Sequence, residues 1–324
     1  MSKLISVLRL PISGLFAWLL LLCVPVDAQQ RDRVYRIGYL SPGPVQEPFR
    51  QRLRELGYVE GKNLLIEYRQ GPGRFPQLAA ELVRLQVDCI LAVGIDATRS
   101  ARLATGAIPI VMGNLSDDPI QHGLITSLAR PGGNITGLID MLPDLAGKRL
   151  ELLKETFPKL TRIAHVSAQG AAPGLAHLKE VETTGRALGI RVQAVEVPGP
   201  DGLENAFRAV AEGRAEAIII VGVSFFIPNQ KRIIALQLKH RLPGMHTHAS
   251  WVPSGGLMSY TTDGAARYRR AAEYVDRILK GTKPADLPVE RPTKFEFVIN
   301  LKTAKQIGVT MPPNVLARAD RVIR

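Results

Sequence analysis

The feature that most constrains this chain is a pair of short apolar segments, each followed directly by small polar residues. Residues 88–93 and 108–112 are apolar on both faces, which is typical of parallel strands covered by helices on each side. The first segment stops at Gly94 before a helical pattern over 96–105, and the second stops at Gly113. Ligands of open α/β sheets bind outside the carboxyl ends of the strands, so this stretch predicts a binding edge.

The polar residues at this edge also have a plainer interpretation. Asp, Ser, Thr and Asn are the favoured residues of helix caps and turns, whatever the function of a protein. Either interpretation fits any single residue, whereas a binding role is favoured for the edge as a whole. The candidate side chains are Asp96, Thr98, Asn114, Ser116, Asp117 and Asp118.

Strand and helix patterns alternate through two successive halves of the chain. The alternation runs over 34–140, restarts near Met141 and continues to residue 254. It predicts an α/β protein of two doubly wound, parallel-sheet lobes with a cleft between them. The tail has a different order of elements, which can complete both lobes and tie them together. We expect lobe 1 to comprise 34–140 plus 255–284, and lobe 2 to comprise 141–254 plus 285–324.

The first 28 residues read as a secretory signal peptide rather than as part of the fold. Lys3 and Arg9 precede an apolar run at 15–24, and Ala28 ends a small-residue cleavage pattern. The apolar run is too short to span a bilayer, which takes about 20 residues. We therefore expect a protein exported to the periplasm.

The two cysteines indicate neither a disulfide nor a metal site. Leu22 stands before Cys23, where lipidation needs a small residue, and this argues against a lipid anchor. Removal of the signal leaves Cys89 alone, inside an apolar strand, where it is expected to be a small buried hydrophobe.

The net charge of +13 raises the question of nucleic acid. Basic residues are interleaved with acids along the helices, as in 50–55 and 148–154, rather than gathered in a basic arm. A solvated basic surface is the preferred interpretation, and no nucleic-acid partner is expected.

Catalytic signatures are missing from the sequence. It contains no GxSxG elbow, no P-loop, no GxGxxG after the first strand and no HExxH. His246 and His248 alternate on one strand and could ligate a metal, but no acid stands near them in the sequence. Asp117 and Asp118 could form an acid pair, although neighbours before a proline more often hold a turn and a ligand ammonium. We therefore expect a binding protein with no catalytic residue, no metal and no cofactor.

Five long segments carry a recognisable pattern. They are FRQRLRELGYVEGKN at 49–63, LARPGGNITGL at 128–138, LAGKRLELLKE at 145–155, GGLMSY at 255–260 and KPADLPVERPTKFEFVINLKTAK at 283–305. These segments resemble the ABC-transporter substrate-binding proteins related to tryptophan- and tyrosine-binding lipoproteins. The similarity extends over essentially the whole chain after the signal.

The resemblance implies a type I periplasmic-binding fold, in which two lobes joined by three hinge crossings close around a small ligand. It implies an ABC permease as partner, and through the permease an ATPase, with membrane contact only by way of the transporter. Carried over position by position, it implies a cleft formed by Ser41, Gly94, Ile95, Asp96, Thr98, Asn114, Ser116, Asp117, Asp118, Ser167, Gln169, Ser224, Phe225, Met258 and Tyr260.

This chain departs from the family pattern where specificity is set. Ile95 stands where the family often has Thr, Ser167-Ala168-Gln169 replaces an Asn-Pro loop, and Ser224 replaces a Pro. The ligand class of the tryptophan-binding relatives therefore does not transfer directly.

The resemblance and the physics of the binding edge suggest an amino acid or a related small carboxylate. Its carboxylate would sit at the start of the helix that carries Asp96, where free N–H groups and the helix dipole favour an anion. Its ammonium would meet Asp117 or Asp118, and Phe225, Phe226 or Trp251 would pack on its side chain. Two alternatives stay open, a periplasmic sensory module and a cryptic enzyme, while the signal peptide argues against a LacI-like regulator.

Overall fold

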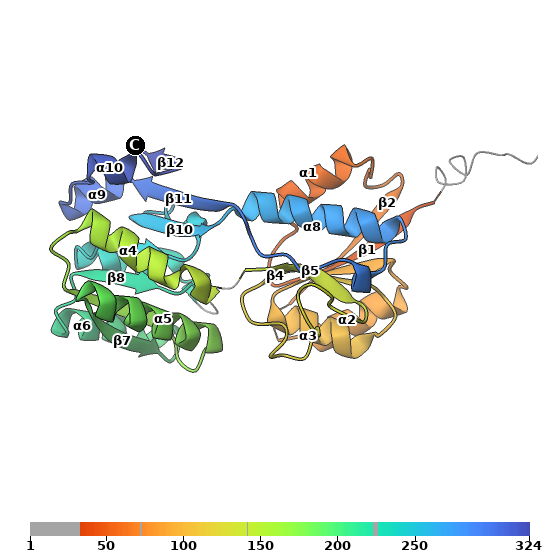
Figure 1. The fold of residues 1–324 in the computed structure, drawn as a ribbon, viewed down its shortest axis with the longest axis horizontal. Coiled ribbons are helices and arrows are strands. Elements are labelled where there is room, and N and C mark those ends of the chain that lie inside the picture. Colours follow the sequence, from red (N-terminus) through yellow and green to blue (C-terminus); the bar gives the residue numbers. More distant parts are fainter. Residues whose placement is uncertain (1–32, 72, 141, 223–225) are drawn as a thin grey trace, which may run out of the picture.

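The computed structural model describes residues 33–71, 73–140, 142–222 and 226–324. Two sheets form two lobes that lie side by side (Figure 1). The sheet of lobe 1 has the order β2-β1-β3-β4-β5, with all neighbours parallel. Its strands are β1 (Tyr35–Ser41), β2 (Leu64–Gln70), β3 (Cys89–Val93), β4 (Ile110–Leu115) and β5 (Ile135–Ile139). Helices α1 (Glu47–Glu55), α2 (Phe75–Arg84) and α3 (Ile95–Ala104) connect them.

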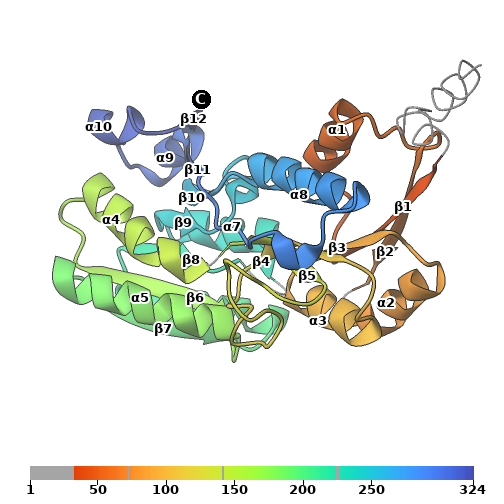
Figure 2. The same ribbon diagram turned by 45° about the vertical axis from the view of Figure 1, so that its right-hand side comes forward.

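Lobe 2 is built around a larger sheet of order β12-β11-β10-β9-β8-β6-β7. Its strands are β6 (Arg162–Ala168), β7 (Arg191–Val197), β8 (Ala217–Ile220), β9 (Gly244–His246), β10 (Met258–Thr262), β11 (Phe295–Asn300) and β12 (Arg321–Ile323). Its helices are α4 (Ala146–Thr156), α5 (Ala172–Leu188), α6 (Leu203–Glu212), α7 (Gln230–Lys239), α9 (Leu301–Ile307) and α10 (Pro313–Leu316). The α4–α5 pair lies along one face of this sheet (Figure 2), and α6 and α7 pack on the other. The expected class of two parallel-sheet α/β lobes is confirmed.

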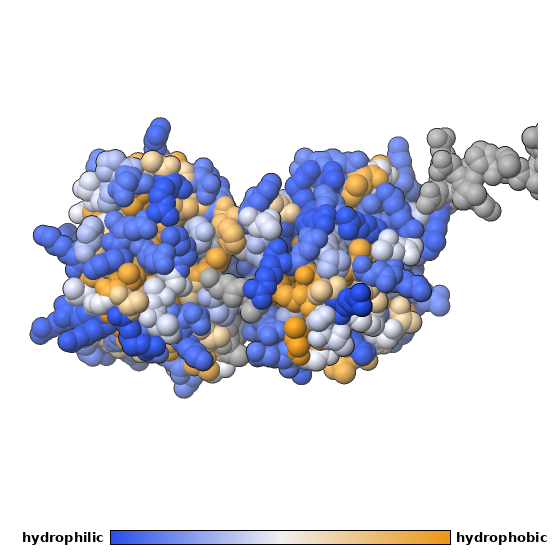
Figure 3. Space-filling view, in the orientation of Figure 1, coloured by the Kyte–Doolittle hydropathy of each residue, from blue (hydrophilic) through white to orange (hydrophobic). Residues whose placement is uncertain are grey.

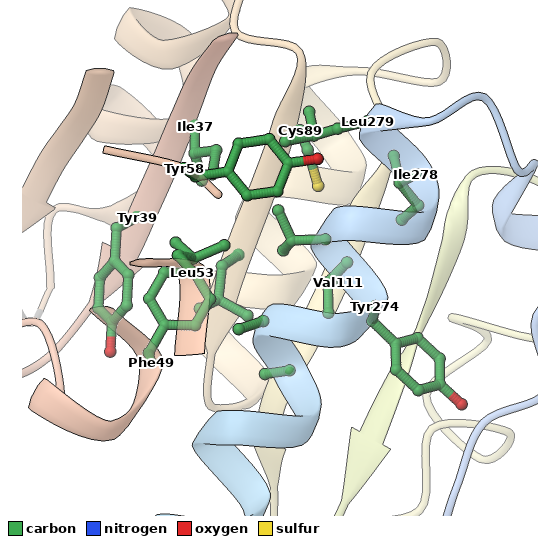
Figure 4. Close-up of a cluster of buried hydrophobic side chains, with 14 of the residues drawn as sticks. Ile37, Tyr39, Phe49, Leu53, Tyr58, Cys89, Val111, Tyr274, Ile278 and Leu279 are labelled. Atoms are coloured by element: carbon green, nitrogen blue, oxygen red, sulfur yellow. The ribbon is translucent and has the colours of Figure 1, made fainter. Parts of the chain in front are cut away.

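The core of lobe 1 depends on a helix that comes late in the sequence. Helix α8 (Gly264–Leu279) packs beside α1 and buries Tyr274, Val275 and Ile278 against the sheet. These side chains belong to one apolar cluster with Phe49 and Cys89. Figure 4 shows the cluster, in which Ile278 and Leu279 of α8 lie on the same side as Cys89. Cys89 is a free, fully buried thiol, as its place in an apolar strand predicts.

The crossing strand corrects the expected division of the chain. Residues 255–284 were expected in lobe 1, but β10 pairs in parallel with β9 and antiparallel with β11, so it belongs to the sheet of lobe 2. Only α8 and the segment to Glu290 return to lobe 1, where the Glu290 N–H donates to the carbonyl of Gly137 at 3.0 Å. The backbone pairing thus places the three crossings after β5, between β10 and α8, and between Glu290 and β11.

The sequence also misplaces the end of β4. The expected stop at Gly113 is wrong, because the strand continues to Leu115 through an irregular register. Gly113 is a packing position rather than a strand end, since a Cβ there would lie 3.0 Å from the Cδ1 of Leu91. A second glycine, Gly137 in β5, has φ +128°, and its Cβ would lie 2.4 Å from the backbone of Met112.

The interior of lobe 2 contains a chain of buried polar side chains. Arg149 of α4 donates through Nε to the carbonyl of Tyr260 at 2.8 Å, and its Nη1 lies 3.0 Å from Nε2 of His177. Because a guanidinium only donates, Nε2 of His177 accepts, and its Nδ1–H donates to Nε2 of His165 at 3.1 Å. Burial lowers the pKa of His165 to about 4, so both imidazoles are neutral near neutral pH.

Within the described ranges, we find no helix with the length and apolar character needed to cross a membrane.

Candidate binding site between the lobes

A polar cavity of about 670 Å³ lies between the two lobes. Gln46 and Pro48, at the start of α1, line it from lobe 1, and 248–250, just past β9, line it from lobe 2. The second crossing and the start of α8 contribute Thr262 and Arg267. The surface is hollowed between the lobes (Figure 3). Its volume matches that of small-molecule sites, which is about 300–1,000 Å³.

An ion pair at the hinge holds Arg267, which lines this cavity. Oδ2 of Asp140, directly after β5, accepts from Oγ1 of Thr262 at 2.9 Å and from Nη1 of Arg267 at 2.8 Å. The Asp140 and Arg267 side chains are each only 11% exposed. Asp140 therefore ties the first crossing to the second and to α8.

His248 contributes a neutral imidazole to the cavity. Its Nε2 lies 2.7 Å from the carbonyl oxygen of Gly222, which can only accept, so Nε2 carries the hydrogen and Nδ1 is an acceptor. Burial, together with the charges of Arg267 and Arg149, lowers the pKa of His248. At neutral pH the site thus offers a hydrogen-bond acceptor here rather than a cation.

The lobe 1 edge at the ends of β3 and β4 is acidic. Asp117 is 17% exposed, and burial and the nearby Asp96 carboxylate raise its pKa, while His122, with Nε2 at 3.9 Å, opposes this. The ends of the two strands are adjacent, because the Gly94 N–H donates to the carbonyl of Asn114 at 2.8 Å. The edge thus brings two carboxylates together and favours a cationic group.

Three of the expected side chains are engaged in local turns, as the capping interpretation predicts. Oγ of Ser41 accepts from the N–H of Gly43, Oγ1 of Thr98 donates to the Gly94 carbonyl, and Oδ1 of Asp118 accepts from the N–H of Ile120.

The remaining lobe 1 candidates are partly accessible. Ser116 is half-buried, Ile95 packs partly against the lobe 1 core, and Oδ1 of Asn114 is buried without a partner among the described residues.

In lobe 2 the structure separates residues that the sequence grouped. Gln169 is exposed just past β6, whereas Ser167 is buried against Gly174. Tyr260 is half-buried and stacks on Phe295 with ring centroids 5.9 Å apart. Ser224 and Phe225 lie outside the described residues.

Met258 and two of the expected aromatic contacts are corrected by the structure. Met258 is fully buried in the lobe 2 core, because β10 lies between two strands of that sheet. Phe226 is also fully buried, and Trp251 is 1% exposed and stacks on His246 at 4.8 Å. These three side chains stabilise lobe 2 and do not line the cavity.

His246 and His248 do not act as a pair of ligands. His246 packs on Trp251 inside the lobe, whereas His248 is held by Gly222 at the cavity. In the described part of the chain, no three His, Cys, Asp or Glu side chains gather where they could hold a metal ion.

The sequence missed Gln46, His248 and Arg267 as cavity residues, and Asp140 as the partner that holds Arg267. Asp140 could have been found, because it is an acid directly beyond the carboxyl end of a strand. Arg267 gave no such signal, since it is one of several arginines on an amphipathic helix.

Two parallel-sheet lobes, joined by three crossings around a polar cavity, define a two-lobed α/β ligand-binding protein. The chain belongs to the ABC transporter substrate binding protein family, whose model matches residues 45–323. Its relatives are solute-binding proteins, so the chain is a binding protein rather than an enzyme.

Three relatives illustrate the similarity. A tyrosine-binding protein of Clostridioides difficile (strain R20291) is 24% identical over 276 residues, which cover 84% of this chain and 79% of that protein. A solved conserved domain protein from Vibrio cholerae is 27% identical with a TM-score of 0.80, and covers 90% of this chain and 99% of its own. The solved ABC domain in complex with L-Trp from Streptococcus pneumonia is 24% identical with a TM-score of 0.81, and the match covers 90% of this chain and 100% of that domain.

Proposed function

We propose that this protein is exported, captures an amino acid or a related small carboxylate between its lobes, and delivers it to an ABC importer. The observation that carries the proposal is the inter-lobe cavity, which is lined by both lobes and by the hinge. A ligand that contacts all three walls would stabilise the closed arrangement relative to the open one, as population shift requires.

The ligand class is supported by the charges that surround the cleft. Asp96 and Asp117 form an acidic edge at the ends of β3 and β4, outside the residues that line the cavity, and Arg267 lines the cavity at the hinge. The zwitterion of an amino acid has an ammonium that suits the acidic edge and a carboxylate that suits the arginine. The relatives named for tyrosine and tryptophan binding support the same ligand class. Because this chain departs from the family pattern at Ile95 and Ser167, the side chain of its ligand need not be that of tyrosine or tryptophan.

The proposed partners follow from the family. An ABC permease would receive the closed form, with the ATPase behind it, and the membrane would be met only through the transporter. Residues 1–28 would direct the chain to the periplasm and be removed there.

A thermal-shift screen of residues 29–324 against amino acids, small carboxylates, purines and sugars tests the proposal. A ligand at about 100 times its Kd adds about 2.7 kcal/mol to the unfolding free energy, which raises Tm by a few degrees in a chain of this size. Hits confined to amino acids or carboxylates are expected. Hits confined to sugars or purines, or no hit in any class, would contradict the proposed ligand.

A further inference from the structure

Arg267 uses only part of its hydrogen-bonding capacity. Its Nη1 donates to Asp140 and to Thr262. Among the described residues its Nε is buried without an acceptor, and its Nη2 makes no hydrogen bond. We call this Nε–Nη2 side the open edge of Arg267, because guanidinium donors are costly to leave unpaired in a protein interior. Nε is covered as the side chain stands, so an acceptor in the cavity would reach it only after the guanidinium rotates.

The open edge of Arg267 belongs to a wall that favours anions. Gly264 and Ala265, the first residues of α8, line the same cavity. First-turn N–H groups have no partner within their helix, and the positive end of the helix dipole lies there. The helix start and the guanidinium act in the same direction on a negative group.

The carboxylates that line this cavity are already engaged. Oδ1 of Asp263 accepts from the N–H of Ala266 at 2.9 Å, and Oδ2 of Asp320 accepts from the N–H of Phe297 at 2.7 Å. Glu296 lies 3.6 Å from Nε of Arg321. None of these local contacts occupies the open edge of Arg267.

The competing place for an anion is the start of α3 on lobe 1. Asp96 stands in the first turn of that helix, and its charge contributes to the raised pKa of Asp117. Two carboxylates there oppose a third negative group. At the hinge, by contrast, the carboxylates of Asp140 and Asp263 already accept from Arg267 and from the Ala266 N–H, and a guanidinium lines the cavity.

We propose that Arg267 and the first turn of α8 form an anion subsite that binds the carboxylate of the ligand. The planar guanidinium fork matches the two oxygens of a carboxylate, and a small rotation about the Nη1 contact would give both Nε and Nη2 an acceptor. The assignment rests on the proposed function, because it names the part of the same cleft that recognises the acid group.

Acetate, compared with its neutral counterpart acetamide, probes the subsite directly. Trp251 is the only tryptophan after residue 28 and directly follows the cavity residues 248–250, so its fluorescence reports on the site. At constant ionic strength, acetate should give a saturable response and acetamide none. Arg267→Gln should weaken acetate binding at least 10-fold, and Arg321→Gln, an arginine of the same cavity, should change it less than 2-fold. No saturable response to acetate, or equal affinity in Arg267→Gln, would overturn the assignment.

A second pair of variants separates ligand binding from the hinge contact of Arg267. Asp140→Asn removes the ion pair but keeps the guanidinium, so acetate should bind at least as tightly as to the parent chain. Arg267→Lys keeps the charge but loses the planar fork. Its affinity for acetate should lie between those of the parent chain and Arg267→Gln. If Arg267 only pins the hinge, Asp140→Asn will lose as much affinity as Arg267→Gln, and the subsite is wrong.

The subsite and the proposed function fail in different ways. If an amino acid binds Arg267→Gln as tightly as it binds the parent chain, the subsite assignment is wrong, but the proposed function is still supported. If acetate binds in a way that depends on Arg267 but no amino acid or larger carboxylate binds, the subsite is supported and the proposed ligand class is wrong.

Discussion

The two lobes share a layered architecture but place their polar groups differently. Lobe 1 has an aromatic and aliphatic interior, and away from the Asp140–Arg267 pair at the hinge it has many partly exposed ion pairs, such as Arg52 with Glu273 at 2.9 Å. Lobe 2 encloses Arg149 and the histidines His165 and His177, all at most 1% exposed.

This difference makes the stability of the lobes depend on different conditions. Exposed ion pairs contribute about 0–1 kcal/mol each and are screened by salt, so lobe 1 should tolerate the loss of any one. Buried polar groups depend on their partners, because losing one leaves the other unpaired in a medium of low dielectric. Lobe 2 should therefore respond strongly to pH and to single substitutions in its interior.

The largest expected difference is a loss of lobe 2 stability in mild acid. Burial lowers the pKa of His165 to about 4 and that of His246 to about 3, against 6.5 in the unfolded chain. The unfolded state therefore binds more protons than the folded state below pH 6.5, and the unfolding free energy falls as the pH is lowered. Between pH 6.5 and 4.5 the two histidines together should remove about 5 kcal/mol.

Urea unfolding followed by Trp251 fluorescence, which reports lobe 2, measures this effect at the two pH values. His165→Gln and His246→Gln should each reduce the pH-dependent loss by about 2 kcal/mol, whatever they do to stability at pH 6.5, and the remaining pH dependence includes that of the buried His177. His122→Gln, at a solvent-exposed histidine of lobe 1, is the matched control and should leave it unchanged. If the parent chain and the three variants all have the same pH dependence, the buried histidines of lobe 2 do not make that lobe more sensitive to acid than lobe 1.

Removal of the buried guanidinium should have the next largest effect. Arg149→Met leaves the Tyr260 carbonyl and Nε2 of His177 without their donor, and each orphaned group costs about 1–3 kcal/mol. We expect the unfolding free energy of lobe 2 to fall by about 3 kcal/mol in the same urea experiment.

The neighbouring Lys148 provides the control for Arg149. Its ammonium pairs with Glu151 at 2.8 Å on the accessible side of the same helix. Lys148→Met should change the unfolding free energy by less than about 0.5 kcal/mol. A similar loss of unfolding free energy in Arg149→Met and Lys148→Met would show that the burial of Arg149 does not account for its effect on stability.

The smallest expected effect concerns the acidic edge of lobe 1. Asp117→Asn removes a half-buried carboxylate from the acidic edge, whereas Asp118→Asn alters a residue engaged in a turn. For an amino-acid ligand found in the thermal-shift screen, Asp117→Asn should weaken binding about 10-fold, or about 1.4 kcal/mol by calorimetry. Asp118→Asn should weaken it less, and the opposite order would assign the ammonium to Asp118.

Much of the fold could be predicted from the sequence because hydrophobic periodicity reports local structure. The strand expected at 88–93 and the helix expected at 96–105 match β3 and α3 to within about a residue, since each has a clear apolar pattern and a glycine lies between them. The short elements α10 and β12 were missed, because four and three residues carry too little periodicity.

The site could be predicted only in part, because a residue type does not show what its side chain contacts. Ser41, Thr98 and Asp118 have the chemistry of ligand contacts, yet each makes a turn or cap hydrogen bond. Met258 was placed in the cleft by its position in a crossing strand, and pairing on both sides of that strand buries it.

The sequence by itself determined the two alternating α/β halves, the family, and the polar edge beyond β3 and β4, because periodicity and local motifs are properties of neighbouring residues. Only the tertiary structure decided that α8 completes lobe 1 while β10 joins lobe 2, since these depend on backbone pairing between distant segments. It alone also brought Arg267 and His248 to one cavity, with Asp140 paired to Arg267, and burial there lowers the pKa of His248.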